Sequence, residues 1–317
     1  MMDFQLKINK IKNSGEYSPD QLFMIESITK YSGFLLGDNV IYFINKSCSS
    51  ESVAIVTNHL SLRTRININS IENYPTFSPG HYDILAYNID NNDIYLESFV
   101  DLCKMYALSS SKVCFRDFFY SLLKLFEPSK DISYTNLIGL FGELSLIKKM
   151  KSDYNLILMD NWHNTYGSND KYDFSLKNFN IEVKTSVKDN MIFSIKHKQL
   201  FNEKQNFVVV INAEQDNSGQ TLSDLFDFFK ETKPFSENID FAIKLELEKS
   251  KVSPQDFKLK KFSVVKYSVF NNKNLETIIN IPQWISNVEY SYDFVSQNEF
   301  GFDNLVKEII NAKKNHL

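Results

Sequence analysis

Residues 172–186 have the sequence pattern of a β-hairpin. Apolar side chains alternate with polar ones in two runs, and the turn-prone segment 178–180 separates them. Because successive side chains of a strand point to opposite faces, the apolar residues fall on one face, which can join a core. The other face then gathers Asp173, Glu182 and Lys184. A protein normally leaves such groups in water, so this grouping needs an explanation.

The segments around this hairpin predict an α/β core. The stretch 131–151 has the spacing of a long helix, and 191–196 has the two-residue alternation of a third strand. A short helix is expected over 197–204. It is followed by 207–211, which is apolar on both faces and suits a central strand covered on both sides. The predicted order over 131–212 is therefore α-β-β-β-α-β, with a central mixed sheet flanked by helices.

The predicted helix over 131–151 contains a carboxylate and two glycines among its apolar residues. Glu143 lies on nearly the same face as its apolar neighbours, where a carboxylate needs a partner. Two interpretations stay open: Glu143 reaches water from the edge of that face, or it meets a partner. Gly139 and Gly142 each cost about 1 kcal/mol in a helix relative to alanine. They predict that another backbone or a ligand approaches the helix closely.

We expect three parts in the chain: an accessory or specificity region over 1–130, the core over 131–235, and an extension over 236–317. The first is predicted to be strand-rich and then helical, and 4–8 is one of its expected strands. The extension is predicted to be rich in short strands and to end in a helix. It is also the most basic part of the chain, through Lys249, Lys251, Lys258, Lys260, Lys261 and Lys266. A lysine-rich stretch is usually a solvated face, but this one is the best candidate for contacts with phosphates.

Composition narrows the class of protein. A chain of 317 residues with 43% hydrophobic residues can bury a substantial core. The net charge of −4 gives no global electrostatic reason to bind nucleic acid, although a local basic groove can exist on an acidic protein. Three cysteines without disulfide or zinc spacing suit a reducing compartment. We find no signal peptide, membrane-spanning run or GxxxxGK loop, and we expect a cytoplasmic protein.

The polar face of the hairpin is suited to bind a metal ion. Asp173 and Glu182 are two carboxylates at the edge of a sheet, with the carbonyl of Val183 between them. Mg²⁺ prefers such hard oxygen ligands and retains waters and phosphate oxygens in addition. Lys184 beside the metal can hold or help to deprotonate the attacking water and stabilise charge on phosphoryl oxygens. The set suits hydrolysis of phosphodiesters better than that of peptides or glycosides.

Asp173, the run Glu182-Val183-Lys184 and the order of elements around them resemble the PD-(D/E)XK nuclease superfamily. The resemblance implies a restriction-endonuclease-like fold. It also implies that Glu143, which follows Gly142, is an additional metal ligand. Gln199, after the third strand, is similar to a polar helix residue found near the active site of many members. Tyr172 stands where the motif has proline, which is commonly lost in this superfamily.

More narrowly, the chain resembles bacterial PD-(D/E)XK motif proteins encoded near restriction and phage-defence genes. The resemblance implies a DNA endonuclease that depends on Mg²⁺, with Mn²⁺ as a substitute. The expected catalytic residues are Asp173, Glu182, Lys184, Glu143 and Gln199, and the expected metal ligands are Asp173, Glu182, Val183 and Glu143. The expected partners are DNA, other defence-system proteins such as an ATPase or a methyltransferase, and a second copy of the chain.

One alternative is a nucleic-acid-binding or assembly subunit that keeps the nuclease-like fold and does not cut. The intact Asp173, Glu182 and Lys184 argue against it, because a binding protein gains nothing from burying three ionisable groups together. The other alternative is an exposed charged hairpin without function.

Overall fold

The computed structural model divides the chain into two compact units. The first comprises Met1–Ser129 and Thr232–Leu247, and the second comprises Lys130–Glu231 and Glu248–Leu317. The extension expected over 236–317 is thus shared between them.

No helix in the described part is long and apolar enough to cross a membrane. The structure describes residues 2–15, 17–18, 21–71, 78–89, 95–109, 113–125, 133–163, 172–188, 191–200, 204–276, 278, 281–282, 284–285 and 288–314.

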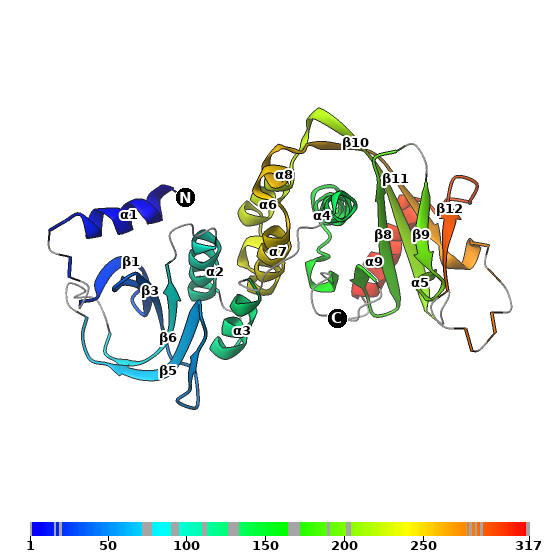
Figure 1. Ribbon diagram of the computed structural model, residues 1–317. Coiled ribbons are helices and arrows are strands. Elements are labelled where there is room, and N and C mark those ends of the chain that lie inside the picture. The colour runs from blue at the N-terminus through cyan, green and yellow to red at the C-terminus, as the bar shows by residue number, and fades with distance from the viewer. Residues whose placement is uncertain are drawn as a thin grey trace. The chain divides into compact units, whose positions relative to one another are not determined.

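The first unit contains an antiparallel sheet of six strands with helices packed on it (Figure 1). Its strands are β1 (Phe23–Thr29), β2 (Ser32–Leu36), β3 (Val40–Lys46), β4 (Ala54–Val56), β5 (Leu60–Ile68) and β6 (Gly80–Asn88). They lie in the order β1-β2-β3-β6-β5-β4. The helical elements are α1 (Met2–Lys12), α2 (Leu96–Leu108), α3 (Phe115–Leu125) and η2 (Phe235–Glu237).

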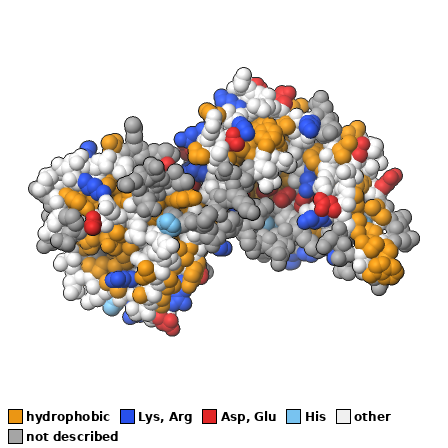
Figure 2. All heavy atoms as spheres, viewed as in Figure 1, with side chains coloured by type: hydrophobic (Ala, Val, Ile, Leu, Met, Phe, Trp, Pro, Cys, Tyr) orange, Lys and Arg blue, Asp and Glu red, His pale blue; other side chains and the backbone are white. Residues whose placement is uncertain are grey.

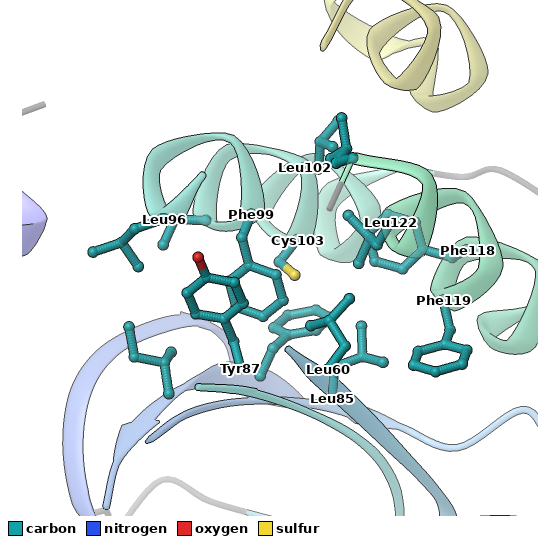
Figure 3. Close-up of a cluster of buried hydrophobic side chains, with 14 of the residues drawn as sticks. Leu60, Leu85, Tyr87, Leu96, Phe99, Leu102, Cys103, Phe118, Phe119 and Leu122 are labelled. Carbon is teal, nitrogen blue, oxygen red and sulfur yellow. The ribbon is translucent and has the colours of Figure 1, made fainter. Parts of the chain in front are cut away.

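Aromatic and aliphatic side chains fill the space between this sheet and its helices. In Figure 3, Phe99 and Cys103 of α2 point toward Tyr87 and Leu85 of β6. The rings of Tyr87 and Phe99 are stacked with their centres 4.8 Å apart. The strand-rich and then helical pattern predicted for this region therefore corresponds to a sheet and the helices that cover one of its faces.

The strand expected over 4–8 is instead part of α1, so this prediction was wrong. Phe4 and Ile8 are buried, with 9% and 1% of their surface exposed, whereas Leu6 is 48% exposed. Positions four residues apart share one face of a helix, while alternate positions share one face of a strand. A short apolar run fits both periods, and packing against the core selected the helical one.

The second unit is built on a mixed sheet of four strands. These are β7 (Phe174–Ser175), β8 (Phe179–Ser186), β10 (Gln205–Gln220) and β11 (Phe262–Asn271). In the order β11-β10-β8-β7, the central pair β8 and β10 is parallel and the outer pairs are antiparallel. Two further strands, β9 (Ile192–Lys196) and β12 (Glu289–Asp293), form an antiparallel ribbon. The helical elements are α4 (Tyr134–Tyr154), η1 (Met159–Asn161), α5 (His197–Leu200), α6 (Leu222–Glu231), α8 (Pro254–Leu259), η3 (Asn272–Asn274) and α9 (Phe302–Lys314).

The sequence α4, β7, β8, β9, α5, β10 confirms the predicted α-β-β-β-α-β order and the restriction-endonuclease-like α/β class. One detail differs: among the described residues β9 pairs with β12 and not with the main sheet. Ser133 caps α4 by accepting a hydrogen bond from the backbone N–H of Asn136.

Helix α7 (Ile239–Lys251) was not predicted; it begins in the first unit and ends in the second. Its segment 245–248 alternates leucine with glutamate, which is a strand-like pattern, and all four of these residues are buried. A helix that is buried on several sides has no single apolar stripe. The helical period is therefore weak in its sequence.

The layers of the second unit place β8 between two different surroundings. In-register neighbours on adjacent strands share a face, so Glu182 and Lys184 lie on the face of Val208 and Val210, which pack with β9 and α5. Thr185 lies on the opposite face, against α4. Figure 1 shows α4 and β9 on opposite sides of β8. The described part of β7 pairs with β8 at only two positions, so the later half of β8 lies at an open edge.

Gly142 allows α4 to pack directly on β8. A Cβ atom added at Gly142 would lie 1.8 Å from the Thr185 Oγ1 atom, well inside van der Waals contact. This confirms the close approach predicted for that glycine, although the neighbour is the side chain of Thr185 and neither a backbone nor a ligand. A Cβ atom at Gly139 would meet nothing within 4 Å, so no close neighbour requires that glycine.

We expect Gly142→Ala to lower the free energy of unfolding by about 1–3 kcal/mol, because the added methyl overpacks the contact with Thr185. Gly139→Ala is the matched control. It should leave stability unchanged or raise it by up to about 1 kcal/mol through helix propensity. Urea unfolding of both variants tests this, and equal losses at the two positions would show that the Thr185 contact is not the cause.

Candidate active site

The predicted hairpin forms and places Asp173 beside β8. Phe174 of β7 pairs with Ile181, and the turn is closed by a hydrogen bond from the Leu176 N–H to the Phe179 carbonyl at 2.9 Å. The alternating apolar residues are buried as expected, including Tyr172, Phe174 and Leu176. A two-residue alternation therefore located the core face of this hairpin correctly.

Asp173 is fixed by backbone contacts on two sides. Its carbonyl accepts a hydrogen bond from the His163 N–H at 2.8 Å, next to an isolated β-bridge between Trp162 and Phe174. Its Oδ2 atom accepts the N–H of Val183 at 2.6 Å. The N–H and C=O of one strand residue point to the same side. The carbonyl of Val183 therefore points to the same open edge of β8, beside the Asp173 side chain.

A pocket of about 390 Å³ opens at this edge and brings most of the predicted residues together. Asp173, Glu182, Val183 and Lys184 line it from the hairpin, and Glu143 lines it from α4. The remaining lining residues are Thr135, Asn136, Gly139, Leu140, Thr185, Phe193, Ser194 and Glu248. The pocket thus receives side chains from both faces of β8, because the edge is where the two faces meet.

Glu182 is the most enclosed carboxylate of the hairpin, with 5% of its surface exposed. Its Oε1 atom accepts two hydrogen bonds, from the Lys184 Nζ atom at 2.7 Å and from the Gln199 Nε2 atom at 3.0 Å. Gln199 is oriented in turn because its Oε1 atom accepts the N–H of Lys196 at 3.2 Å. The structure therefore gives Gln199, which does not line the pocket, a contact with Glu182.

Glu143 has a partner that the sequence analysis did not identify. Its Oε2 atom accepts a hydrogen bond from the Trp162 Nε1 atom at 2.7 Å, and Trp162 itself is fully buried. Of the two interpretations of Glu143, the one with a partner is therefore correct. The loop 162–169 was expected to be turn-rich, and only 162–163 fall within the described residues. A tryptophan in such a loop was the available signal, since a buried indole needs an acceptor.

Three carboxyl groups of the pocket, those of Glu143, Asp173 and Glu182, have raised pKa values. Burial raises the pKa of Glu143 to about 8, against the hydrogen bond from Trp162. The negative charges of Glu248 and Glu182 add to that rise. Burial, followed by the charge of Glu182, raises the pKa of Asp173 well above its ordinary value. The pKa values of Glu143 and Asp173 rise for the same physical reason, because several negative charges are confined together away from water.

Lys184 counters part of this charge. Burial lowers the pKa of Lys184, but the charge of Glu182 and its hydrogen bond to Lys184 outweigh burial, so the pKa lies above its ordinary value. Conversely, burial raises the pKa of Glu182 against the opposing effects of Lys184 and Gln199. An ammonium group at this position is a hydrogen-bond donor that can face a phosphoryl oxygen or a water molecule.

Comparison with known proteins agrees with this geometry. The family model described as "Putative PD-(D/E)XK family member, (DUF4420)" matches residues 39–294, well over half of the chain. The chain belongs to this PD-(D/E)XK family. The match confirms the superfamily resemblance, and it extends across parts of both units. Searches of curated proteins and of solved structures found no match.

Nucleases of the PD-(D/E)XK type generally depend on a divalent metal, and the donors in this pocket fit one. No group of three or more His, Cys, Asp or Glu side chains in the described part is arranged to hold a metal ion. Mg²⁺, however, commonly binds through one or two carboxylates and water. Asp173, Glu182 and the Val183 carbonyl supply that set. The Glu182 Oε2 atom is buried without a hydrogen-bond partner among the described residues. A buried oxygen of this kind needs a partner, and it fits the role of a ligand of a cation.

Three of the six lysines proposed as a phosphate-contacting surface form ion pairs with acidic side chains. Lys251, Lys260 and Lys266 form ion pairs with Glu248, Asp256 and Glu299 at 2.6, 2.9 and 2.5 Å. On the face seen in Figure 2, basic and acidic side chains are interspersed among the coloured atoms and neither forms a continuous patch. This PD-(D/E)XK protein thus shows no broad basic face in that view.

We expect Trp162→Phe to lower the free energy of unfolding by about 1–3 kcal/mol, because it leaves the half-buried Glu143 carboxylate without this donor. Trp284→Phe is the control, since Trp284 is 86% exposed, and it should change stability by less than about 0.5 kcal/mol. Urea unfolding measures both. The effect of Trp162→Phe should shrink in a Glu143→Ala background, and an undiminished effect would mean that the hydrogen bond is not responsible.

Proposed function

We propose that this protein is a metal-dependent endonuclease that hydrolyses phosphodiester bonds of DNA. The observation that carries the proposal is the convergence of Asp173, Glu182, Lys184 and Glu143 in one pocket at the open edge of β8. The family supports a nuclease-like protein, and the pocket chemistry supports phosphodiesters as the substrate class. Hard oxygen donors beside an ammonium group match a divalent cation and a phosphoryl group bound together.

In this proposal, Asp173, Glu182 and the carbonyl of Val183 would hold Mg²⁺, with Mn²⁺ as a substitute, and Glu143 would assist from α4. The bound cation supplies a more acidic water molecule and neutralises charge on the phosphoryl oxygens. Gln199 keeps the Glu182 carboxylate in one orientation through the 3.0 Å contact. A fixed carboxylate loses less entropy when it binds a ligand.

Lys184 positions the nucleophilic water and the phosphoryl group. Its Nζ atom lies 2.7 Å from the Glu182 Oε1 atom, so the ammonium group is already directed at the metal-binding side of the pocket. Two N–H bonds of the ammonium remain after this contact. They can donate to a water molecule and to an oxygen of the scissile phosphate, where negative charge develops during attack.

We also propose a role in a restriction or phage-defence system in the cytoplasm. This rests on the narrower resemblance to motif proteins encoded near such genes. Its substrates would be plasmid or phage DNA, and its partners would include an ATPase or methyltransferase and a second copy of this chain. A double-strand cut needs two active sites or two successive cuts, which is the physical reason to expect a dimer.

We expect purified protein to cut DNA with Mg²⁺ or Mn²⁺ and to lose cleavage in EDTA. Asp173→Ala and Lys184→Ala should each reduce cleavage at least about 100-fold, because each removes a group that stabilises the charged transition state. Both variants should remain folded and bind DNA. The assay is gel analysis of plasmid, phage and modified DNA, with circular dichroism and a DNA-binding measurement alongside.

Lys177→Ala is the matched lysine control, because Lys177 is exposed in the turn of the same hairpin and does not line the pocket. It should cut like the unaltered protein. Full activity of Asp173→Ala, or cleavage that persists in EDTA, would contradict the proposed site. Binding without cleavage on every DNA and with either metal would instead favour the subunit that keeps the fold and does not cut.

A further inference from the structure

Glu248 is a fourth acidic residue of the same pocket, and it comes from an element outside the predicted core. It belongs to the last turns of α7 and lines the pocket with Glu143, Asp173 and Glu182. Only 5% of its surface is exposed. Burial of a charged group is costly unless it is paired. A buried glutamate at the wall of a pocket that already contains three carboxylates therefore requires a reason.

Lys251 holds Glu248 in place. Its Nζ atom lies 2.6 Å from the Glu248 Oε1 atom, and the two side chains are only 9% and 7% exposed. The pair is three residues apart on one helix, a spacing that brings side chains together. A buried ion pair adds little stability compared with apolar residues of the same size. The presence of Glu248 at this wall is better explained by the negative charge that its carboxylate places beside the pocket.

We propose that Glu248 is a positioning residue of this active site whose negative charge, held in place by Lys251, strengthens the binding of the divalent cation. The inference rests on the proposed function, because it assumes that the pocket binds such a cation. The carboxylate acts through the pocket's electric field and through Glu143, its neighbour on α4. Residues that support metal ligands from outside commonly change metal affinity about 10- to 100-fold when they are altered.

The same helix offers a matched control. Glu246 is also buried, with 3% exposed surface, but it does not line the pocket, and its Oε2 atom accepts a hydrogen bond from the Ser98 Oγ atom at 2.6 Å. Residues two apart on an α-helix point in nearly opposite directions. Glu246→Gln and Glu248→Gln are therefore the same chemical change on the same helix, with only one of them at the pocket.

The experiment measures binding of Mn²⁺ alone to the full chain, with free Mn²⁺ followed by electron paramagnetic resonance. We expect Glu248→Gln to raise the dissociation constant about 10-fold or more, and Glu246→Gln to leave it within about 2-fold. Lys251→Met should change the dissociation constant in the opposite direction and lower it, because the ammonium group of Lys251 then no longer offsets the charge of Glu248. A Glu248→Gln/Lys251→Met double variant should return to the value of Glu248→Gln.

The outcomes separate this inference from the function on which it rests. If the unaltered chain and Asp173→Ala bind Mn²⁺ equally, or if neither binds it, the proposed metal site itself is wrong. If binding requires Asp173 but Glu248→Gln matches the unaltered chain, only the role of Glu248 is wrong. Equal losses in Glu246→Gln and Glu248→Gln would assign the effect to α7 as a whole and overturn the inference. If Lys251→Met does not fold, the comparison of the two glutamine variants still decides.

Discussion

The confinement of several carboxylates at one edge of a strand is the constraint on which the candidate active site depends. Glu182 is almost fully buried, and its two oxygens differ: one receives Lys184 and Gln199, while the other has no hydrogen-bond partner among the described residues. Such an arrangement is costly for folding. In the proposed function, the unpaired Glu182 oxygen would coordinate a cation, and that contact would offset part of the cost.

Uncharged residues of the scaffold also support this pocket. Gly142 brings α4 against Thr185, and Glu143, the next residue of α4, lines the pocket at the edge of β8. Trp162 then holds the Glu143 carboxylate by its indole N–H. A site at a sheet edge can collect groups from both faces of a strand, which a site on one face cannot. This explains why a helix and a hairpin both contribute.

Several elements could be predicted because their local patterns have one solution. The alternation over 172–186 has only one assignment of faces, and the structure confirms the hairpin, the buried apolar face and the order of elements that follows. Two patterns had a second solution. The run 4–8 fits a strand or a helix, and the Leu-Glu alternation of α7 suggests a strand although the segment is a buried helix. In both cases contacts with distant residues, and not local preference, chose the helical period.

The sequence by itself determined which chemistry is available: two carboxylates and a lysine in a fixed two-residue alternation must share one side of a hairpin. It also indicated the helical Glu143 and the family to which the chain belongs. Only the tertiary structure decided that Trp162 binds Glu143, that Gln199 contacts Glu182, and that Glu248 reaches the pocket. Trp162 and Glu143 are 19 positions apart in the sequence, and Gln199 and Glu182 are 17 positions apart. No periodicity encodes them, because they arise from how whole elements pack.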